Sequence, residues 1–388
     1  MSEVSEKKNH KLHSNHRTAL LLGGGGARAA YQVGVLKAIA EIVPRGCPNP
    51  FPIICGTSAG SINTVALASN ANDFHLGVER TLNVWENFQL GHVFYADTKN
   101  LSKRIISWVW SHLGFGRASR GPSSLLDNQP LRELLGKYIS FKRIDQAIES
   151  GSLHAYCLTS CSYTSGESTS FFDGHKHIDS WKRTHREGRR AKMTIEHMMA
   201  SSAIPVVFPS IKLGDEYFGD GSMRQVSPIS PAVHLGADKI LIIGLRMESQ
   251  LGMREPAKQM PSLGQISGYI LDTLFLNSLF ADVERMERVN RMLRESPSRD
   301  EEPLQIIDHL IISPSQDIAD IAIRHYQKLP RSFRIALKFV GLDGGNSRRF
   351  ISYLMFIEDF CQELIALGYR DAMAQREQLK AFLSSSVQ

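Results

Sequence analysis

The stretch that decides the fold is LLGGGGARAA, residues 21–30, in which four consecutive glycines separate two patterned segments. Residues 18–22, TALLL, form a short apolar run of the kind found in a buried strand. Residues 31–42, YQVGVLKAIAEI, have apolar side chains at helical spacing. Glycine lets a backbone approach other atoms closely, because it has no β-carbon. A glycine-rich turn from strand to helix therefore indicates a place where backbone N–H groups face a ligand.

The alternation of strand and helix patterns continues along the chain. Apolar runs typical of buried strands lie at residues 18–22, 50–55, 153–160, 239–245 and 304–313, and a further, more exposed strand is expected at 169–175. Amphipathic helical patterns lie between several of them. This order predicts an α/β fold, a three-layer α/β/α sandwich around a mainly parallel central sheet. In such sheets, sites gather where strands end and helices begin.

We expect three parts in the chain. Residues 1–17 are polar and are expected to form a disordered arm, and residues 18–245 are expected to form the α/β domain. Residues 246–388 are predicted to be a mostly helical C-terminal extension with one strand near 304–313. Its longest helical pattern, residues 262–295, has an apolar stripe made of Leu279, Val283, Met286 and Leu293.

Composition limits the class of protein. With 388 residues, 42% hydrophobic and 22% charged, the sequence is typical of a globular protein and contains no apolar run of roughly 18 residues that would span a membrane. The first sixteen residues do not resemble a secretory signal, and five scattered cysteines lack the spacing of a zinc site. We therefore expect reduced cysteines, no metal, no cofactor and a cytoplasmic protein that can associate peripherally with membranes.

A formal net charge of +6 would suit an anionic partner, either a membrane surface or nucleic acid. The basic run at 182–192 is either a solvated surface or a site of attraction to lipid head groups. Residues 101–116, with Trp108 and Trp110, are either core or a lipid-facing lid. No recognised nucleic-acid-binding motif surrounds the basic run, so we do not expect a nucleic-acid partner.

A second motif follows the second predicted strand. Residues 56–60 read G-T-S-A-G, a G-x-S-x-G pattern placed between a strand and a helical segment. In a nucleophile elbow of this form, Gly56 and Gly60 leave room for a tight turn that exposes the serine at a helix N-terminus. The helix dipole there favours developing negative charge. Ser58 is therefore the candidate nucleophile.

The glycine run then has a chemical interpretation. Acyl transfer places negative charge on a carbonyl oxygen, and the backbone N–H groups of Gly24, Gly25 and Gly26 are the candidate oxyanion hole. An alternative is the dinucleotide-binding fingerprint, which residues 24–29 also fit. That fingerprint requires an acidic residue at the end of the second strand, where this sequence has Cys55 and Gly56.

A nucleophilic serine needs a base. Asp220, between two glycines in YFGDGSM, is the candidate, although an aspartate in this setting is often only a turn residue. A Ser-His-Asp triad is the alternative, with the histidine supplied by His234, His309 or His325. For the dyad we predict that Asp220 is partly buried, since burial raises the pKa of a carboxyl group and makes it a stronger base.

With residues 23–29, 56–60 and 220–221 in this order, the chain resembles the patatin-like phospholipase family. ASSAIPVVFP (200–209) and GADKILIIGL (236–245) are also similar to family segments, and the helical end resembles bacterial members. The sequence departs from the family pattern at Ala29, Ser222 and Gly23. The resemblance implies a lipid acyl hydrolase of phospholipase A or lysophospholipase type with a Ser58–Asp220 dyad.

The resemblance also bears on Arg28 and on the alternatives. Arg28 stands at the basic position of the family loop, where it would orient the loop or contact a lipid phosphate. Two alternatives to the dyad hydrolase stay open. One is a catalytically weak protein of the same fold acting as a regulatory or membrane-binding module, and the other is a Ser-His-Asp esterase.

Overall fold

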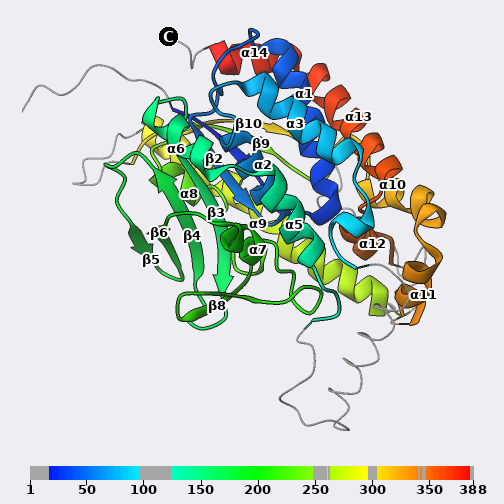
Figure 1. The fold of residues 1–388 in the computed structure, drawn as a ribbon. Helices are drawn as coiled ribbons and strands as arrows, with labels where there is room; N and C mark the ends of the chain where they lie inside the picture. The colour runs from blue at the N-terminus through cyan, green and yellow to red at the C-terminus, as the bar shows by residue number, and fades with distance from the viewer. Residues whose placement is uncertain are drawn as a thin grey trace, which may run out of the picture.

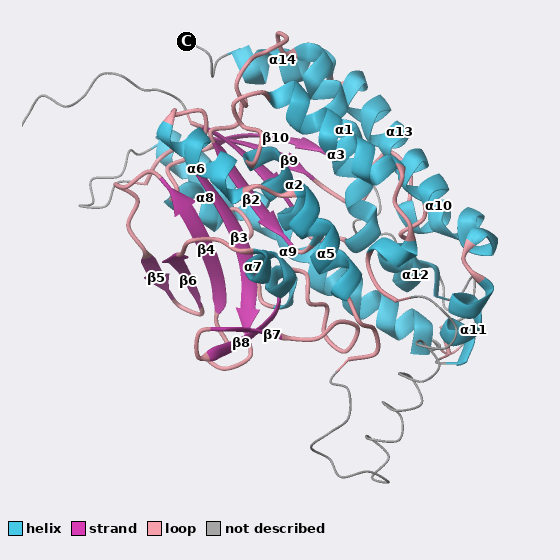
Figure 2. Cartoon of the chain, in the orientation of Figure 1, coloured by secondary structure: helices cyan, strands magenta, loops and turns pink. Residues whose placement is uncertain are grey.

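The computed structural model describes residues 17–95, 124–247, 260, 263–295, 304–339, 341–342 and 347–384. Within these residues one sheet of ten strands runs through the molecule, with helices on both of its faces (Figures 1 and 2). The strands are β1 (Thr18–Leu22), β2 (Ile53–Thr57), β3 (Ala155–Ser162), β4 (Ser168–Gly174), β5 (Trp181–Arg183), β6 (Arg186–Arg190), β7 (Ile211–Leu213), β8 (Glu216–Asp220), β9 (Lys239–Ile243) and β10 (Asp308–Ile312). The helices are α1 (Ala30–Ile42), α2 (Ala59–Ala68), α3 (Phe74–Glu86), α5 (Gln129–Tyr138), α6 (Phe141–Glu149), α7 (Ile195–Ser201), α8 (Ser230–His234), α9 (Leu263–Glu295), α10 (Ile318–His325), α11 (Arg331–Phe339), α12 (Arg348–Leu354), α13 (Glu358–Ala374) and α14 (Arg376–Ser384).

The sheet is mainly parallel in its centre. Its order is β10-β9-β1-β2-β3-β4-β6-β5, and the five strands from β10 to β3 are mutually parallel. β4 and β8 both pair antiparallel with β3, and β7 extends β8 as a hairpin. The predicted α/β fold with a mainly parallel sheet is confirmed. The carboxyl ends of β1 and β2 lie side by side, because Leu22 is in register with Gly56.

Alternate residues of each central strand belong to different cores, which creates the three layers. Leu20 and Leu22 of β1 face the larger core, which contains α1, α2, α3 and α13. Ala19 and Leu21 face the smaller core, where they meet α8 and α9. Strands covered on both faces need apolar residues at every position, so TALLL has no polar alternation. Of the predicted stripe on α9, Val283 and Leu293 are buried, and Leu279 and Met286 pack against the smaller core.

The expectation of a more exposed strand near 169–175 is wrong. β4 is buried at every position except Asp173, which is half-buried. The reason is that β6 pairs with its outer edge and that Trp181 of β5 stacks on Phe172, with ring centroids 5.1 Å apart. A short hairpin after β4 therefore covers a strand whose own sequence is partly polar.

The C-terminal region completes the sandwich. β10 pairs with β9 and extends the sheet, while α13 lies along α1 on the larger core (Figure 1). At the crossing of these helices, a β-carbon on Gly34 would lie 2.0 Å from the carbonyl oxygen of Ile365, and one on Gly368 would lie 2.1 Å from that of Tyr31. Only glycine permits backbones to approach this closely. The two helices are therefore in direct backbone contact.

Several expectations fall outside the described residues, namely the segment 101–116 and all of the arm at 1–17 except Arg17. Among the helices that the structure describes, none has both the length and the apolar character that crossing a membrane requires.

Candidate active site

Ser58 occupies a strained turn between β2 and α2. Its backbone angles are φ 54° and ψ −129°, in a region that residues with side chains rarely adopt. A β-carbon on Gly60 would lie 2.1 Å from the carbonyl oxygen of Leu22, and one on Gly56 would lie 2.6 Å from the carbonyl oxygen of Gly60. Gly60 is thus required by close packing at the end of β1, and Gly56 by close packing against the start of α2. This is the geometry of a nucleophile elbow.

A set of serines holds the turn in place. The Ser58 N–H donates to Ser201 Oγ over 3.0 Å, and Ser201 Oγ donates to the carbonyl oxygen of Thr159 over 2.7 Å. The N–H and Oγ of Ser61 both donate to the Ser58 carbonyl oxygen. No motif in the sequence marks Ser201 as a residue that positions Ser58. The only signal for it was the segment ASSAIP, which contains this residue.

Asp220 ends β8 and is fully buried. Its Oδ1 accepts a hydrogen bond from the Ser222 N–H over 2.9 Å. Burial raises the pKa of Asp220 from 3.8 to about 7, while hydrogen bonds from Ser58 and Ser222 oppose the rise. Among the described residues, no donor forms a well-aligned hydrogen bond with Oδ2, although the Ser58 hydroxyl is near enough to oppose the rise in the pKa of Asp220. Oδ2 is therefore available to accept a proton. The burial of Asp220 exceeds the partial burial that we predicted.

The glycine loop lies directly against these two residues. A β-carbon on Gly24 would lie 3.0 Å from Ser58 Cβ and 2.5 Å from Ser222 Oγ. A β-carbon on Gly25 would lie 2.4 Å from Leu245 Cδ1. Gly26 has φ 56°, and a β-carbon there would lie 2.2 Å from the carbonyl oxygen of Tyr353. Each of the three candidate oxyanion residues therefore has a separate steric reason to be glycine.

A chain of hydrogen-bonded side chains holds the start of this loop in place, and no sequence pattern indicates it. Gln32 Nε2 donates to the Gly23 carbonyl oxygen over 2.9 Å, and Asn63 Nδ2 donates to Gln32 Oε1 over 2.9 Å. Trp85 Nε1 in turn donates to Asn63 Oδ1 over 2.8 Å. The side chains of Gln32, Asn63 and Trp85 are all buried. Their hydrogen bonds therefore fix the loop relative to α2 and α3.

Arg28 is buried and faces the C-terminal helices. Its Nη2 lies 3.2 Å from Asp272 Oδ1 of α9, and its Nε donates to Ser352 Oγ of α12 over 2.8 Å. The guanidinium carbon also lies 4.0 Å from the centroid of the Tyr353 ring. These contacts tie the glycine loop to α9 and α12. They favour the loop-orienting role over contact with a lipid phosphate.

An apolar pocket opens at Ser58. It encloses about 920 Å³, part of it open to solvent, between α2, α3 and α5. Its walls include Ile62, Val84, Trp85, Leu131, Leu135 and Phe356. A wall made of aliphatic and aromatic side chains favours hydrocarbon over polar groups.

The three candidate triad histidines make other contacts. The ring of His234 stacks on Trp181 with centroids 4.7 Å apart. His309 pairs with Glu287, and His325 pairs with Glu363. None of these partners belongs to the elbow or to the aspartate turn. In the described part of the chain, no group of three or more histidine, cysteine or acidic side chains is arranged to hold a metal ion.

The comparisons with known proteins identify the family of this chain. The family model for patatin-like phospholipases matches residues 20–233, which is more than half of the chain. The chain therefore belongs to the patatin-like phospholipase family, a family of lipid acyl hydrolases. Membership of this family agrees with the acyl-hydrolase interpretation of residues 24–29 and not with the dinucleotide-binding fingerprint.

Individual relatives match over part of their length. A cGAMP-activated phospholipase of Pseudomonas aeruginosa is 26% identical over 210 residues, which is 54% of this chain and 53% of the relative. Patatin-like phospholipase domain-containing protein 7 of Rattus norvegicus is 47% identical over 51 residues, 13% of this chain and 3% of the relative. The structure of human GIVD cytosolic phospholipase A2 with methyl gamma-linolenyl fluorophosphonate matches at 12% identity and a TM-score of 0.45, covering 97% of this chain and 60% of that one. This chain thus spans about half the length of the Pseudomonas relative.

Proposed function

We propose that this protein is a serine lipid acyl hydrolase of phospholipase A or lysophospholipase type, with Ser58 as nucleophile and Asp220 as general base. The observation that carries the proposal is the position of a fully buried aspartate, with a pKa raised to about 7, beside a serine at the mouth of an apolar pocket. A carboxylate with this pKa accepts a proton near neutral pH far better than an ordinary aspartate does.

The reaction has two steps. In the first, Asp220 Oδ2 accepts the Ser58 hydroxyl proton while Ser58 Oγ attacks the ester carbonyl carbon. The tetrahedral intermediate collapses to an acyl-enzyme as the alcohol leaves with the proton from Asp220. In the second, Asp220 takes a proton from water as the water oxygen attacks the acyl carbon, and Asp220 then returns this proton to Ser58 Oγ as the Oγ–acyl bond breaks and the fatty acid leaves.

The glycine loop supplies the electrostatic part of this proposal. Backbone N–H groups of Gly24, Gly25 and Gly26 would donate to the oxyanion, each contributing about 3 to 4 kcal/mol of transition-state stabilisation. Close contact of Gly24 with Ser58 supports this role. The amide chain from Trp85 to the Gly23 carbonyl keeps the donors fixed before the reaction begins. The acyl chain would lie in the apolar pocket beside Ser58.

We also propose that α9 contacts the lipid surface. On one side of this helix, Ile266, Tyr269 and Ile270 are 43%, 62% and 51% exposed. On the opposite side, Phe275 lies against Gly24, since a β-carbon on that glycine would be 2.8 Å from Phe275 Cδ1. One helix thus presents apolar side chains to the surroundings and packs against the catalytic loop. Peripheral attachment through α9 would bring lipid close to Ser58.

The test is release of fatty acid from phospholipid and lysophospholipid vesicles by the wild type, Ser58→Ala and Asp220→Asn. The matched control is Asp282→Asn, because Asp282 is a second buried aspartate with a raised pKa but contacts Arg285 and the Ile229 N–H instead of the elbow. The dyad predicts loss of activity in the first two variants and its retention in the control.

A second set of variants separates the dyad from a triad. His234→Gln, His309→Gln and His325→Gln combined should leave hydrolysis intact. Loss of activity in this variant, together with retention in Asp220→Asn, would assign the base to a histidine and refute the dyad. Vesicle binding without hydrolysis of any lipid by the wild type would instead support the alternative of a regulatory or membrane-binding module.

A further inference from the structure

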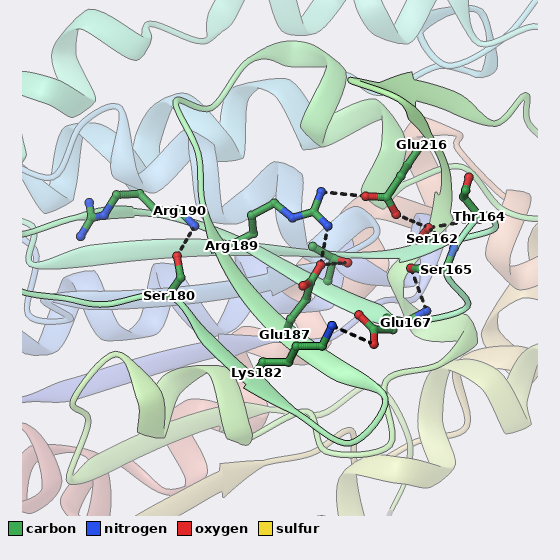
Figure 3. A network of polar contacts seen from close by, with 11 residues as sticks. Ser162, Thr164, Ser165, Glu167, Ser180, Lys182, Glu187, Arg189, Arg190 and Glu216 are labelled. Carbon is green, nitrogen blue, oxygen red and sulfur yellow. Dashed lines mark hydrogen bonds and ion pairs between the residues drawn. The ribbon is translucent and has the colours of Figure 1, made fainter.

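Most of the basic run at 182–192 is neutralised within the protein. Figure 3 shows Arg189 between Glu187 and Glu216, at 2.6 Å and 2.9 Å, and Lys182 beside Glu167 at 3.6 Å. The Arg190 guanidinium donates to three backbone carbonyls, and Lys192 pairs with Asp145. These cations hold β4, β5 and β6 to their neighbours.

Arg186, the first residue of β6, is an exception. Its Nε is buried and has no hydrogen-bond partner within the described residues. The side chain borders a small cavity, partly open to solvent, between the β5–β6 hairpin and residues 224–231. A buried donor without an acceptor is costly, so such a group indicates that an acceptor from outside the protein can fill the cavity.

The cavity, which we call the Arg186 pocket, combines basic side chains with an apolar wall that includes Trp181, Val226 and Pro231. Arg186, Arg224 and His185 border it together with the hydroxyl-bearing Ser168 and Ser170. Within the described ranges, no carboxylate lies within ion-pairing distance of Arg224 or Arg186. The nearby acids are already engaged, because Glu187 binds Arg189 and Thr169, and Asp282 binds Arg285 and a backbone N–H. Arg186 opposes the rise in the pKa of Asp282 at longer range, and Glu187 also borders the pocket, so the two guanidinium groups have acidic neighbours but no direct ion pair among the described residues.

Hydrogen bonds link the Arg186 pocket to Thr57, the residue before Ser58. Gln225, which borders the pocket, accepts from Thr57 Oγ1 over 2.9 Å and donates to Thr159 Oγ1 over 3.3 Å. Thr57 immediately precedes Ser58, and Arg224 and Gln225 directly follow the turn that contains Asp220. The pocket shares no bordering residue with the apolar pocket. It is thus a second, chemically different cavity next to the same elbow.

From these observations we propose that the Arg186 pocket binds a phosphate group. Two arginine side chains with a planar arrangement of donors, together with serine hydroxyls, match the oxygens of a phosphate monoester or diester. The phosphate belongs either to a phospholipid head group or to a free phosphate compound. The first of these two forms of the proposal rests on the proposed function. The two sources share the same recognition chemistry and differ in their effect on hydrolysis.

The first test is direct binding of inorganic phosphate and of glycerol 3-phosphate to the full chain by isothermal titration calorimetry, with glycerol as the uncharged comparison. The variants are Arg186→Gln and Arg224→Gln; Arg224 is exposed, so its replacement should leave folding intact if Arg186→Gln does not fold. The control is Arg183→Gln, which removes the same charge from the same hairpin but does not border the pocket.

We expect both phosphate probes to bind and glycerol not to bind. The affinity should fall about tenfold in Arg186→Gln and Arg224→Gln, as expected for loss of one charge-assisted hydrogen bond, and should not change in Arg183→Gln. Absence of binding to the wild type at millimolar phosphate would overturn the proposal. An equal loss in Arg183→Gln would also overturn it, because the effect would then come from overall charge.

The second test separates the two sources of phosphate. Wild type and Arg224→Gln are compared on phosphatidylglycerol and on diacylglycerol in the same mixed micelles. A head-group site predicts about a tenfold fall in kcat/KM on the phospholipid only. A site for a free phosphate compound predicts that Arg224→Gln hydrolyses both lipids as fast as the wild type does. It also predicts that added inorganic phosphate changes the activity of the wild type but not that of Arg224→Gln. If the wild type hydrolyses no lipid, the proposed function fails, while calorimetry still decides whether the pocket binds phosphate.

Discussion

Replacement of Asp220 by asparagine should abolish hydrolysis and, at the same time, stabilise the folded protein in a pH-dependent way. Folding raises the pKa of this carboxyl group from 3.8 to about 7, chiefly because it is buried. Between these two pH values the folded state binds more protons than the unfolded state, so the wild type loses stability as the pH rises. The loss is about 1.4 kcal/mol per pH unit and reaches about 4 kcal/mol above pH 7.

Asparagine cannot ionise, so Asp220→Asn does not suffer this loss. Its side-chain oxygen can still accept the Ser222 N–H that Oδ1 accepts in the wild type. The free energy of unfolding of the variant, relative to the wild type, should therefore increase from pH 4 to pH 8 by up to about 4 kcal/mol. For a chain of this length, that corresponds to a rise in Tm of about 5 °C at pH 8.

The measurement is urea denaturation of both proteins at pH 5, 6, 7 and 8, with thermal unfolding as a second readout. Glu216→Gln is a control with the opposite sign. Burial raises the pKa of Glu216, but hydrogen bonds from Ser162 and Arg189 outweigh this effect and lower it. That carboxylate therefore stabilises the fold above its unfolded pKa of 4.5, so its contribution is already complete at pH 5 and the effect of Glu216→Gln should stay constant from pH 5 to pH 8. A stability difference between Asp220→Asn and the wild type that stays constant from pH 5 to pH 8 would refute the raised pKa and with it the reasoning for the base.

Three other predictions follow from the same contacts. Wild-type kcat/KM should fall about tenfold per pH unit below about pH 7, since only ionised Asp220 can act as the base; a profile that is flat down to pH 5 would argue against this role. Gly24→Ala should lower kcat at least about 100-fold, because the added methyl group would meet Ser58 and Ser222. Gly23→Ala is the control, because a methyl group there would lie in open space, and its kcat in the same assay should stay near the wild-type value. Arg28→Gln should lower the free energy of unfolding by about 3 kcal/mol, because Asp272 loses its buried ion-pair partner and keeps the Tyr353 hydroxyl and the more exposed Arg349; adding Asp272→Asn should restore part of that loss in urea denaturation.

The features that could be predicted from the sequence are those encoded in neighbouring residues. The elbow at Ser58 follows from five consecutive residues between a strand and a helix, and the strained backbone angles agree with it. The central strands were recognisable because a strand covered on both faces is apolar throughout. The exposure of β4 was wrongly predicted because its burial depends on pairing with β6, and the sequence of β4 contains no information about that partner.

Contacts between distant parts of the chain could not be read in this way. Arg28 meets Ser352 across 324 residues, and a buried arginine has the same sequence signal as an exposed one. Similarly, Asn63 and Gln32 lie in ordinary helical patterns, and only the fold brings their amides together under Gly23. A polar residue on a helix is usually exposed, so burial in a hydrogen-bonded chain leaves no periodic trace.

The proposed oxyanion hole is one reason for the glycine run, and steric confinement of the loop is a second. Gly24 is confined by the nucleophile on one side and by Phe275 of α9 on another, and Gly26 is confined by the backbone of α12. An oxyanion hole requires N–H groups at fixed positions, but it does not require the absence of every side chain in the loop. Under the proposed mechanism the run is therefore glycine-rich for two independent reasons, since the backbone would face the reacting carbonyl group and C-terminal helices pack within contact distance of the same backbone. It follows that the C-terminal helices help to set the geometry of the site, although they lie beyond the residues that carry the motifs.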